Sequence, residues 1–357
     1  MKIFIILGTR PEIIKMSPII RECQKRHLNF SILHTNQHYS QNLDKIFFKE
    51  LNLPQPRYNL NVGSGTHAEQ TAKILLGIEK ILIKEKPDIV LVEGDTNTVL
   101  AGALAAAKLH IKIGHIEAGL RSYDREMPEE INRILTDHCS DLLFAPTKQA
   151  KEILLKEGVL SKKIFITGNT IVDAVFQNIK LAERKSKILK KLHLQKEEYF
   201  LLTAHRQENV DNKERLEGIL KGVELISQKF SLPVIYSIHP RTRKMLKKFK
   251  LSVSKNINLI EPLGYLDFLK LQQNAKLILT DSGGVQEEAC IMKVPCVTLR
   301  DNTERPETLL VKSNILAGTN PQKIMKSAKK MLNLKKQWKN PFGNGTAAEK
   351  ILKVIKS

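Results

Sequence analysis

Acidic side chains follow two apolar runs in the first half of the sequence. The run Ile89–Val92 continues to Asp95, and the run over 112–115 continues to Glu117. Carboxylates at the ends of buried strands stand where α/β enzymes keep their general acids and bases. A single aspartate before a helix is more often an N-cap, so Asp95 alone has a structural explanation. Two acids at neighbouring strand ends predict a catalytic function.

Glu129 is a third acid with a competing structural explanation. It follows Pro128 and precedes Glu130 at the start of a helical pattern. Proline at the first helical position with glutamate behind it is the usual chemistry of a helix N-terminus. The residues alone therefore favour a structural role for Glu129.

Basic residues follow the first apolar run. Residues 2–7 lead into Gly8-Thr9-Arg10-Pro11-Glu12 and then into a helix that carries Lys15. A turn of this kind presents Arg10 and Lys15 at a helix N-terminus, where anions bind, although ordinary surface cations remain an alternative. The turn lacks the Gly-x-Gly-x-x-Gly dinucleotide pattern, and the chain has no P-loop motif.

Two histidines also stand at strand ends, each with an arginine nearby. His205 precedes Arg206, and His239 precedes Pro240-Arg241. One such histidine is usually structural, but the repeated His and Arg pairing indicates an anion site. No His-x-x-x-His or Cys-x-x-Cys spacing supports a metal site, so we expect no metal and no redox cofactor.

The clearest motif is a strand, a small-residue turn and a helix over 278–289. Ser282, Gly283 and Gly284 let the backbone approach a ligand closely, and their N–H groups lie where a helix N-terminus binds a diphosphate. Glu288 stands where a carboxylate can hold ribose hydroxyls, and Arg305 follows a later strand. A tight turn with two glycines is the structural alternative.

The composition is that of a globular protein with about two domains. The chain has 357 residues, of which 42% are hydrophobic and 27% charged, and this excludes a disordered or fibrous chain. Its formal charge of +21 raises the question of a polyanionic partner. The densest lysine stretches, 241–250 and 329–339, have the spacing of amphipathic helices, and aromatic residues are only 5% of the chain. We therefore expect no nucleic-acid partner.

No apolar run approaches the roughly 18 residues that a membrane span needs, and the opening run stops at Gly8. The four cysteines form no Cys-x-x-Cys pair. These features predict a reduced, cytoplasmic protein without a membrane partner.

Short β-branched runs alternate with helical patterns along the whole chain, which predicts parallel sheets. We expect a helix over 148–157, with Thr147 as its N-cap and Gly158 after it, and a surface helix with a connector over 181–198. The expected strands cover residues 2–7, 30–34, 89–92, 112–115, 142–145, 164–167, 199–203, 234–238, 257–260, 277–280 and 294–298.

This alternation of strands and helices predicts an α/β protein with two doubly wound Rossmann-like domains and the active site in the cleft between them. The first domain, 1–175, would carry the acids, and the second, 176–339, would bind the nucleotide. Residues 340–357 would form a C-terminal helix that packs back on the first domain.

Taken together, the motifs from Gly8-Thr9-Arg10-Pro11-Glu12 to Asn340-Pro341-Phe342-Gly343 resemble the non-hydrolysing UDP-N-acetylglucosamine 2-epimerases. The resemblance implies the GT-B architecture, a homodimer, a UDP-sugar substrate and no cofactor. Asp95, Glu117 and Glu129 resemble the catalytic acids, and His205 the histidine near the diphosphate and sugar. Residues that resemble the substrate and UDP contacts are Arg10, Lys15, His239, Phe268, Ser282, Gly283, Gly284, Glu288 and Arg305.

The resemblance also implies the reaction: loss of UDP across C1 and C2 to give 2-acetamidoglucal, then re-addition of UDP after the opposite face has been presented. The stretches 37–41 and 63–70 lack an arginine that bacterial members often carry there, which argues against an activating second substrate molecule. Alternatives are an epimerase of a modified UDP-sugar, a GT-B glycosyltransferase, a hydrolysing epimerase and a basic RNA-binding or scaffold protein.

Overall fold

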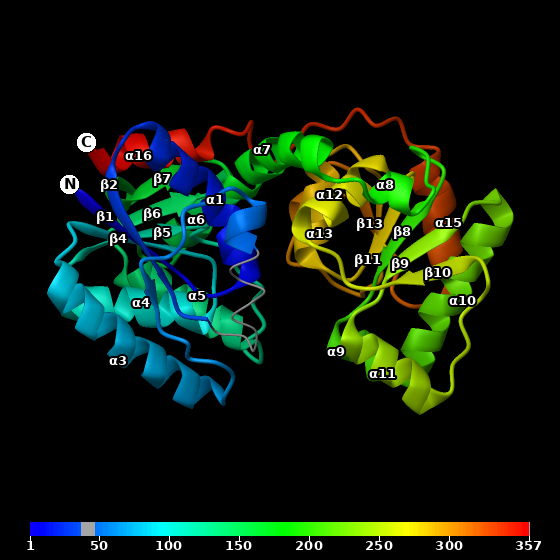
Figure 1. Ribbon diagram of the computed structural model, residues 1–357, viewed down its shortest axis with the longest axis horizontal. Coiled ribbons are helices and arrows are strands. Elements are labelled where there is room, and N and C mark those ends of the chain that lie inside the picture. Colours follow the sequence, from blue (N-terminus) through cyan, green and yellow to red (C-terminus); the bar gives the residue numbers. More distant parts are fainter. Residues whose placement is uncertain (37–46, 357) are drawn as a thin grey trace. The chain divides into compact units, whose positions relative to one another are not determined.

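The computed structural model describes residues 1–36 and 47–356, and it divides into two compact units (Figure 1). Unit 1 comprises Met1–Gln177 with Phe342–Ser357, and unit 2 comprises Asn178–Pro341. Residues 37–41, where the sequence departs from the bacterial pattern, lie outside the described residues. Within the described part of the chain, no helix is long and apolar enough to cross a membrane.

A parallel sheet forms the centre of unit 1. Among the described residues it has seven strands in the order β3-β2-β1-β4-β5-β6-β7. Such a sheet is buried on both faces, which explains why its strands are continuous apolar runs. The strands are β1 (Lys2–Leu7), β2 (Asn29–His34), β3 (Tyr58–Asn59), β4 (Ile89–Glu93), β5 (Lys112–Ile116), β6 (Leu142–Ala145) and β7 (Ile164–Ile166).

Helices cover both faces of this sheet, with α3, α4 and α5 on one face and α1 and α16 on the other (Figure 1). Ile74 and Ile78 of α3 and Val99 of α4 pack against Phe4 and Val92 of the sheet. The helices are α1 (Arg10–Lys25), α3 (His67–Glu85), α4 (Asn97–Lys108), α5 (Pro128–Cys139), α6 (Lys148–Lys156), α7 (Thr170–Lys185), whose end reaches unit 2, and α16 (Ala347–Lys356).

Unit 2 repeats this architecture. Over its described residues the parallel sheet has six strands in the order β10-β9-β8-β11-β12-β13. The strands are β8 (Phe200–Thr203), β9 (Val234–Ser237), β10 (Ile257–Ile260), β11 (Leu277–Thr280), β12 (Cys296–Thr298) and β13 (Asn314–Leu316).

Two separate clusters of buried side chains cover the two faces of the second sheet. One cluster includes α10 and α15, and the other includes α8, α12 and α13. The helices are α8 (Ile188–Lys191), α9 (Gln207–Val210), α10 (Lys213–Phe230), α11 (Pro240–Phe249), α12 (Tyr265–Asn274), α13 (Gly283–Ile291), α14 (Pro306–Leu310) and α15 (Pro321–Leu332).

The C-terminal segment returns to unit 1 through hydrogen bonds with the start of α7. The Asn169 N–H donates to the Phe342 carbonyl oxygen over 2.9 Å. The Asp173 carboxylate accepts from the N–H groups of Ala347 at 3.2 Å and Ala348 at 3.0 Å. Asp173 thereby satisfies N–H groups in the first turn of α16, which would otherwise lack partners.

Every strand expected from the sequence is present, and both sheets are parallel as predicted. Thr147 caps α6 through its hydroxyl, which accepts from the Ala150 N–H at 3.1 Å. The helix expected over 181–198 is wrong in its bounds, because α7 begins at Thr170 and only the short α8 lies within the rest of the stretch. Ala182 and Ile188 are buried, so this region is packed rather than a free surface helix.

Candidate active site

The carboxyl ends of β1, β4 and β5 bring three loops of unit 1 to one edge of the sheet. β1 pairs with β4, and Glu93 at the end of β4 lies in register with Ile116 at the end of β5. Since the strands are parallel, the residues that follow them are neighbours at this edge. The structure thus gathers the loops that carry Asp95, Glu117 and the start of α1.

Lys15 lies between two buried carboxylates. Its Nζ is 3.1 Å from Glu93 Oε1 and forms an ion pair with Glu117. Burial raises the pKa of Glu93 well above its usual value; Lys15 opposes this rise and the neighbouring Glu117 reinforces it. Sequence reasoning paired neither Lys15 with Glu117 nor either of them with Glu93, although a glutamate that ends an apolar strand was a signal for such a cluster.

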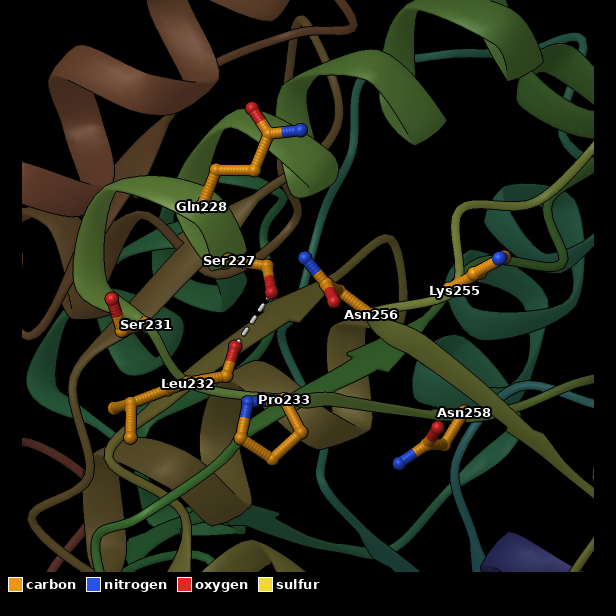
Figure 2. Close-up of a pocket in the computed structure, with 8 residues that line it drawn as sticks. All are labelled: Ser227, Gln228, Ser231, Leu232, Pro233, Lys255, Asn256 and Asn258. Atoms are coloured by element: carbon orange, nitrogen blue, oxygen red, sulfur yellow. Dashed lines mark hydrogen bonds between the residues drawn. The ribbon is translucent and has the colours of Figure 1, made fainter.

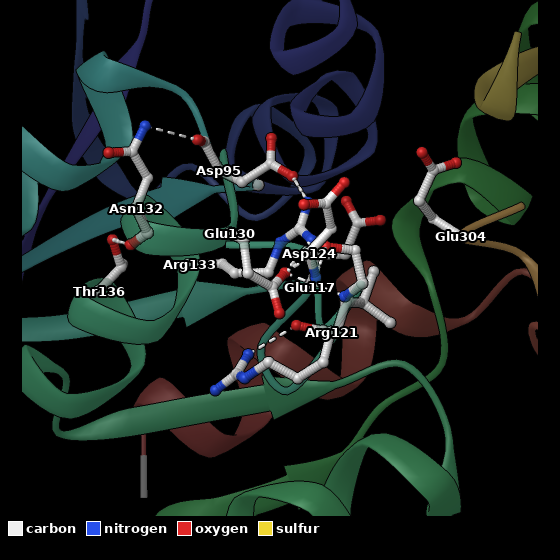
Figure 3. Close-up of polar contacts among 12 residues, drawn as sticks. Asp95, Glu117, Arg121, Asp124, Glu130, Asn132, Arg133, Thr136 and Glu304 are labelled. Atoms are coloured by element: carbon white, nitrogen blue, oxygen red, sulfur yellow. Dashed lines mark hydrogen bonds and ion pairs between the residues drawn. The ribbon is translucent and has the colours of Figure 1, made fainter. Parts of the chain in front are cut away.

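Asp95 is held from α5 rather than used as a cap. The N-cap of α4 is Thr96, whose hydroxyl accepts from the Val99 N–H at 3.4 Å, so the capping explanation for Asp95 is wrong. The Arg133 guanidinium forms an ion pair with Asp95, and Asn132 Nδ2 donates to the Asp95 carbonyl oxygen over 2.9 Å (Figure 3). The Asp95 side chain is still 35% exposed, which leaves its carboxylate accessible.

Glu129 and Glu130 at the start of α5 differ in surroundings. Glu130 is buried and accepts from the N–H groups of Ser122 and Tyr123, both over 2.9 Å. Burial alone would raise the pKa of Glu130, but these hydrogen bonds and Arg133 outweigh it and lower the pKa. Glu129 is half-buried, and no described residue hydrogen-bonds to its side chain. Glu130 therefore holds the loop, and Glu129 remains available for chemistry.

The turn after β1 is organised by Glu12. Its carboxylate accepts from the Gly8 N–H and from the Thr9 hydroxyl, both over 2.7 Å. Burial raises the pKa of Glu12 to about 7 against these hydrogen bonds. Arg10, at the start of α1, lies over the Phe47 ring with 4.3 Å between its Cζ and the ring centroid.

His115 of β5 contacts both Asp137 of α5 and the loop that follows β4. It is fully buried, with Nδ1 2.7 Å from Asp137 Oδ1 and Nε2 2.9 Å from the Gly94 carbonyl oxygen. Burial would raise the pKa of Asp137, but His115 and Arg121 outweigh it and hold that pKa low. Sequence reasoning missed this network, because its members are distant in the chain.

In unit 2, His205 and His239 lie close together. Their ring centroids are 5.9 Å apart, and His205 Nδ1 is 3.0 Å from Oδ1 of the buried Asp281. Burial would raise the pKa of Asp281, but hydrogen bonds from His205 and Arg206 lower it. The His205 side chain is 41% exposed, so Asp281 orients an accessible imidazole. Asp281 was another residue that sequence reasoning did not single out.

Ser282, Gly283 and Gly284 form the start of α13, as the motif predicted. Ser282 is the N-cap, and its side chain makes no capping hydrogen bond. Gly284 is exposed, and a Cβ placed there would meet no atom within 4 Å. The helix N-terminus is therefore open to a ligand, and its N–H groups favour an anion.

The side chains of the remaining candidates of unit 2 contact other residues of that unit. Glu288 is buried and accepts from the Tyr265 hydroxyl over 2.9 Å and from Gln272 Nε2 over 2.6 Å. Arg305 Nε is 2.7 Å from Oε1 of the buried Glu287. Phe268 in α12 is half-buried against the cluster that covers one face of the sheet.

A pocket of about 460 Å³ lies elsewhere in unit 2, lined by the end of α10 and by residues near the starts of β9 and β10 (Figure 2). This is the amino edge of the sheet, whereas ligands of doubly wound sheets bind at the carboxyl edge. None of the candidate residues lines it. Across residues 1–36 and 47–356, no group of three or more His, Cys, Asp or Glu could hold a metal ion.

Comparisons with known proteins relate the chain to one family. The family model described as UDP-N-acetylglucosamine 2-epimerase matches residues 21–356. A Methanocaldococcus jannaschii protein named UDP-N-acetylglucosamine 2-epimerase is 62% identical, over 99% of both chains. A Pseudomonas aeruginosa protein named UDP-2,3-diacetamido-2,3-dideoxy-D-glucuronate 2-epimerase is 42% identical over 99% of both chains.

A solved structure has the same fold along the whole chain. The crystal structure of the M. jannaschii UDP-GlcNAc 2-epimerase in complex with UDP-GlcNAc and UDP superposes with a TM-score of 0.91. The match covers 100% of this chain and 99% of that one at 62% identity.

Proposed function

The chain belongs to the UDP-N-acetylglucosamine 2-epimerase family, and on that premise we propose that it interconverts UDP-N-acetylglucosamine and UDP-N-acetylmannosamine. The proposal is supported by relatives of this activity that match nearly the full chain, and by a relative's structure that contains UDP-GlcNAc and UDP. Within this chain, the observation that carries it is the gathering of Asp95 and Glu117 at one sheet edge.

The proposed route is elimination of UDP and its return. A carboxylate removes the C2 proton, the C2–H electron pair forms the C1=C2 double bond, and the C1–O electron pair leaves with UDP. The intermediate is 2-acetamidoglucal, and the reverse steps on the opposite face of C2 give the epimer. Because the C2 proton is very weakly acidic, its removal must be coupled to departure of a stabilised UDP.

The residues take the following roles in this proposal. Asp95, Glu117 and Glu129 are the proton-transferring acids, and His205, oriented by Asp281, faces the diphosphate and sugar. The N–H groups at the start of α13 stabilise the leaving UDP. The remaining substrate and UDP contacts are Arg10, Lys15, His239, Phe268, Ser282, Gly283, Gly284, Glu288 and Arg305.

A second candidate is an epimerase of a modified UDP-2-acetamido sugar. The P. aeruginosa relative, at 42% identity, carries the name of such an enzyme. The same UDP contacts and the same acids would serve it, since the elimination involves only C1 and C2. The substituents at C3 and C6 would then decide between the substrates.

Proton NMR of the purified protein in deuterium oxide tests the proposal. With UDP-N-acetylglucosamine and a chelator, and without NAD, we expect UDP-N-acetylmannosamine to accumulate with deuterium at C2. Retention of the C2 hydrogen would contradict elimination. Turnover of a UDP-2,3-diacetamido glucuronate substrate without turnover of UDP-N-acetylglucosamine would establish the second candidate. Release of UDP only with an added acceptor would identify a glycosyltransferase.

The proposal includes a cytoplasmic homodimer, as the family resemblance implies. Sedimentation equilibrium of the purified protein should give twice the chain mass of 40.5 kDa. A monomer that epimerises at full rate would remove the dimer from the proposal.

A further inference from the structure

Glu93 is a buried carboxyl beside a proposed catalytic acid, and none of the roles above includes it. It is the last residue of β4 and is 1% exposed. Its Oε1 is 3.1 Å from Lys15 Nζ. Lys15 also contacts Glu117, so the three side chains form one cluster.

Burial and like charge in this cluster favour a proton on one of its two carboxyl groups. The side chains of Lys15, Glu93 and Glu117 are only 13%, 2% and 4% exposed. Both carboxyl groups contact the same ammonium, so they lie close together, and two ionised carboxylates at such a distance repel each other; a proton on one of them removes this repulsion. Burial adds to the cost of keeping both carboxyl groups ionised.

The surrounding groups favour Glu93 as the holder of that proton. Glu12 of α1 is a further acid that disfavours a negative charge on Glu93. Lys15 forms an ion pair with Glu117 as well as with Glu93, and Glu117 begins the loop that leads away from β5. Glu93 lies inside the sheet and is the more enclosed of the two by side-chain exposure.

We propose that Glu93 is a positioning residue for the proposed reaction. Its carboxyl holds the one proton of a Glu93–Glu117 pair bridged by Lys15, and it thereby keeps Glu117 ionised and oriented. This inference rests on the proposed function. After Glu117 removes the C2 proton, the carboxyl groups of Glu93 and Glu117 are both protonated and neutral beside Lys15. The positive charge of Lys15 disfavours this neutral pair, and it therefore favours return of a proton from Glu117 to the substrate.

The pH profile of kcat tests this role in Glu93→Gln and Glu93→Ala. The wild type should lose turnover at alkaline pH, where the shared proton leaves. The amide of Glu93→Gln donates to Glu117 at every pH, so kcat should stay within about threefold of wild type at neutral pH while the alkaline decline disappears. Glu93→Ala should lose roughly tenfold or more in kcat with little change in KM.

Glu85→Gln is the matched control. Glu85 is also a buried carboxylate of unit 1 paired with a lysine, since Lys2 Nζ lies 2.7 Å from Glu85 Oε2. Its pH profile should match wild type. An unchanged alkaline decline in Glu93→Gln, or wild-type kcat in Glu93→Ala, would overturn the proposal.

Infrared spectroscopy supplies a readout that needs no turnover. At neutral pH, the difference spectrum between wild type and Glu93→Gln should contain a protonated-carboxyl C=O band; its absence would overturn the inference. If Glu93→Gln does not fold, the same band should shift in Glu117→Gln, and an unshifted band would overturn it instead. A wild type that shows the band and does not epimerise would contradict the proposed function alone.

Discussion

Gly284 destabilises the helix in which it lies, and the contacts that the structure describes do not require a glycine there. It is exposed in the first turn of α13, and a Cβ would meet nothing within 4 Å. Glycine in a helix costs about 0.5–1 kcal/mol relative to alanine. The open space would allow a ligand to approach the backbone, as the proposed UDP site requires.

We expect Gly284→Val to weaken UDP binding strongly and Gly284→Ala to weaken it to an intermediate degree. Unit 2 should be slightly more stable in Gly284→Ala than in wild type. Isothermal calorimetry with UDP and thermal unfolding would measure the two effects. Gly218→Ala in α10 is the control, because its Cβ would clash with the Thr319 carbonyl oxygen. That variant should lose stability and keep its intrinsic UDP affinity. Equal UDP affinity in wild type and Gly284→Val would place the nucleotide elsewhere.

The three acids of unit 1 give a second expectation at this scale. Asp95→Asn, Glu117→Gln and Glu129→Gln should each reduce turnover by roughly a hundredfold or more, which is the usual contribution of a positioned acid or base. Folding and UDP affinity should survive. A variant that folds and turns over at the normal rate would show that its residue is structural.

Glu12 makes stability depend on pH. Its pKa is about 7 in the folded protein against 4.5 for the free group, a difference of about 3 kcal/mol. Because the folded pKa is raised, this contribution is fully present below pH 4.5 and is lost as the pH rises through 7. Urea unfolding between pH 5 and about 8 should show a steeper fall for wild type than for Glu12→Gln. Parallel curves would mean that Glu12 is ionised throughout.

At the scale of elements, the sequence predicts the long buried strands well and the short ones poorly. Runs such as Ile89–Val92 are identifiable because a parallel strand buried on both faces is apolar throughout. β3 and β13 were missed, because two or three residues, Tyr58–Asn59 and Asn314–Leu316, carry no period. Their pairing is fixed by neighbouring strands rather than by their own composition.

The candidate site divides in the same way. Sequence reasoning identified residues next to strand ends, such as Asp95 and Glu117, because position along the chain is enough to place them at the sheet edge. It missed the partners that orient them, such as Arg133 and Asp281, because those contacts join residues far apart in the chain. The assignment of roles to Glu129 and Phe268 came from family resemblance and stays a prediction.

The docking of α16 depends on one buried carboxylate. Asp173 accepts from two N–H groups at the start of α16, and a capping carboxylate is worth about 1–2 kcal/mol. We expect Asp173→Ala to lower the stability of unit 1 by about that amount and leave UDP affinity unchanged. Chemical denaturation followed by a probe in unit 1 would measure it. Lys350→Ala, an exposed change on the same helix, should be nearly neutral, and equal stabilities of Asp173→Ala and wild type would contradict the capping role.

At the scale of the whole molecule, the two units have separate hydrophobic clusters, those of unit 1 around β1 and β4 and those of unit 2 around β8 and β11. The stability of each unit can therefore change separately when a ligand binds to that unit. A ligand that binds only the folded state stabilises its unit by about 2.7 kcal/mol at a concentration of 100 times Kd.

This separation lets hydrogen exchange locate the nucleotide. With UDP at 100 times its Kd, slow amides of β8 and β11 should exchange about 100-fold more slowly, because their exchange requires unit 2 to open. Amides of β1 and β4 in unit 1 should change much less, since the residues assigned to UDP binding are mainly in unit 2.

Arg305→Ala should reduce this protection at a fixed UDP concentration, because it removes a cation assigned to UDP. Arg243→Ala is the control, since Arg243 forms an exposed ion pair with Glu261 in the same unit. It should leave the protection intact, because exposed pairs contribute little. Protection confined to β1 and β4 would assign the nucleotide to unit 1, and the roles given to Ser282, Gly284 and Arg305 would then be wrong.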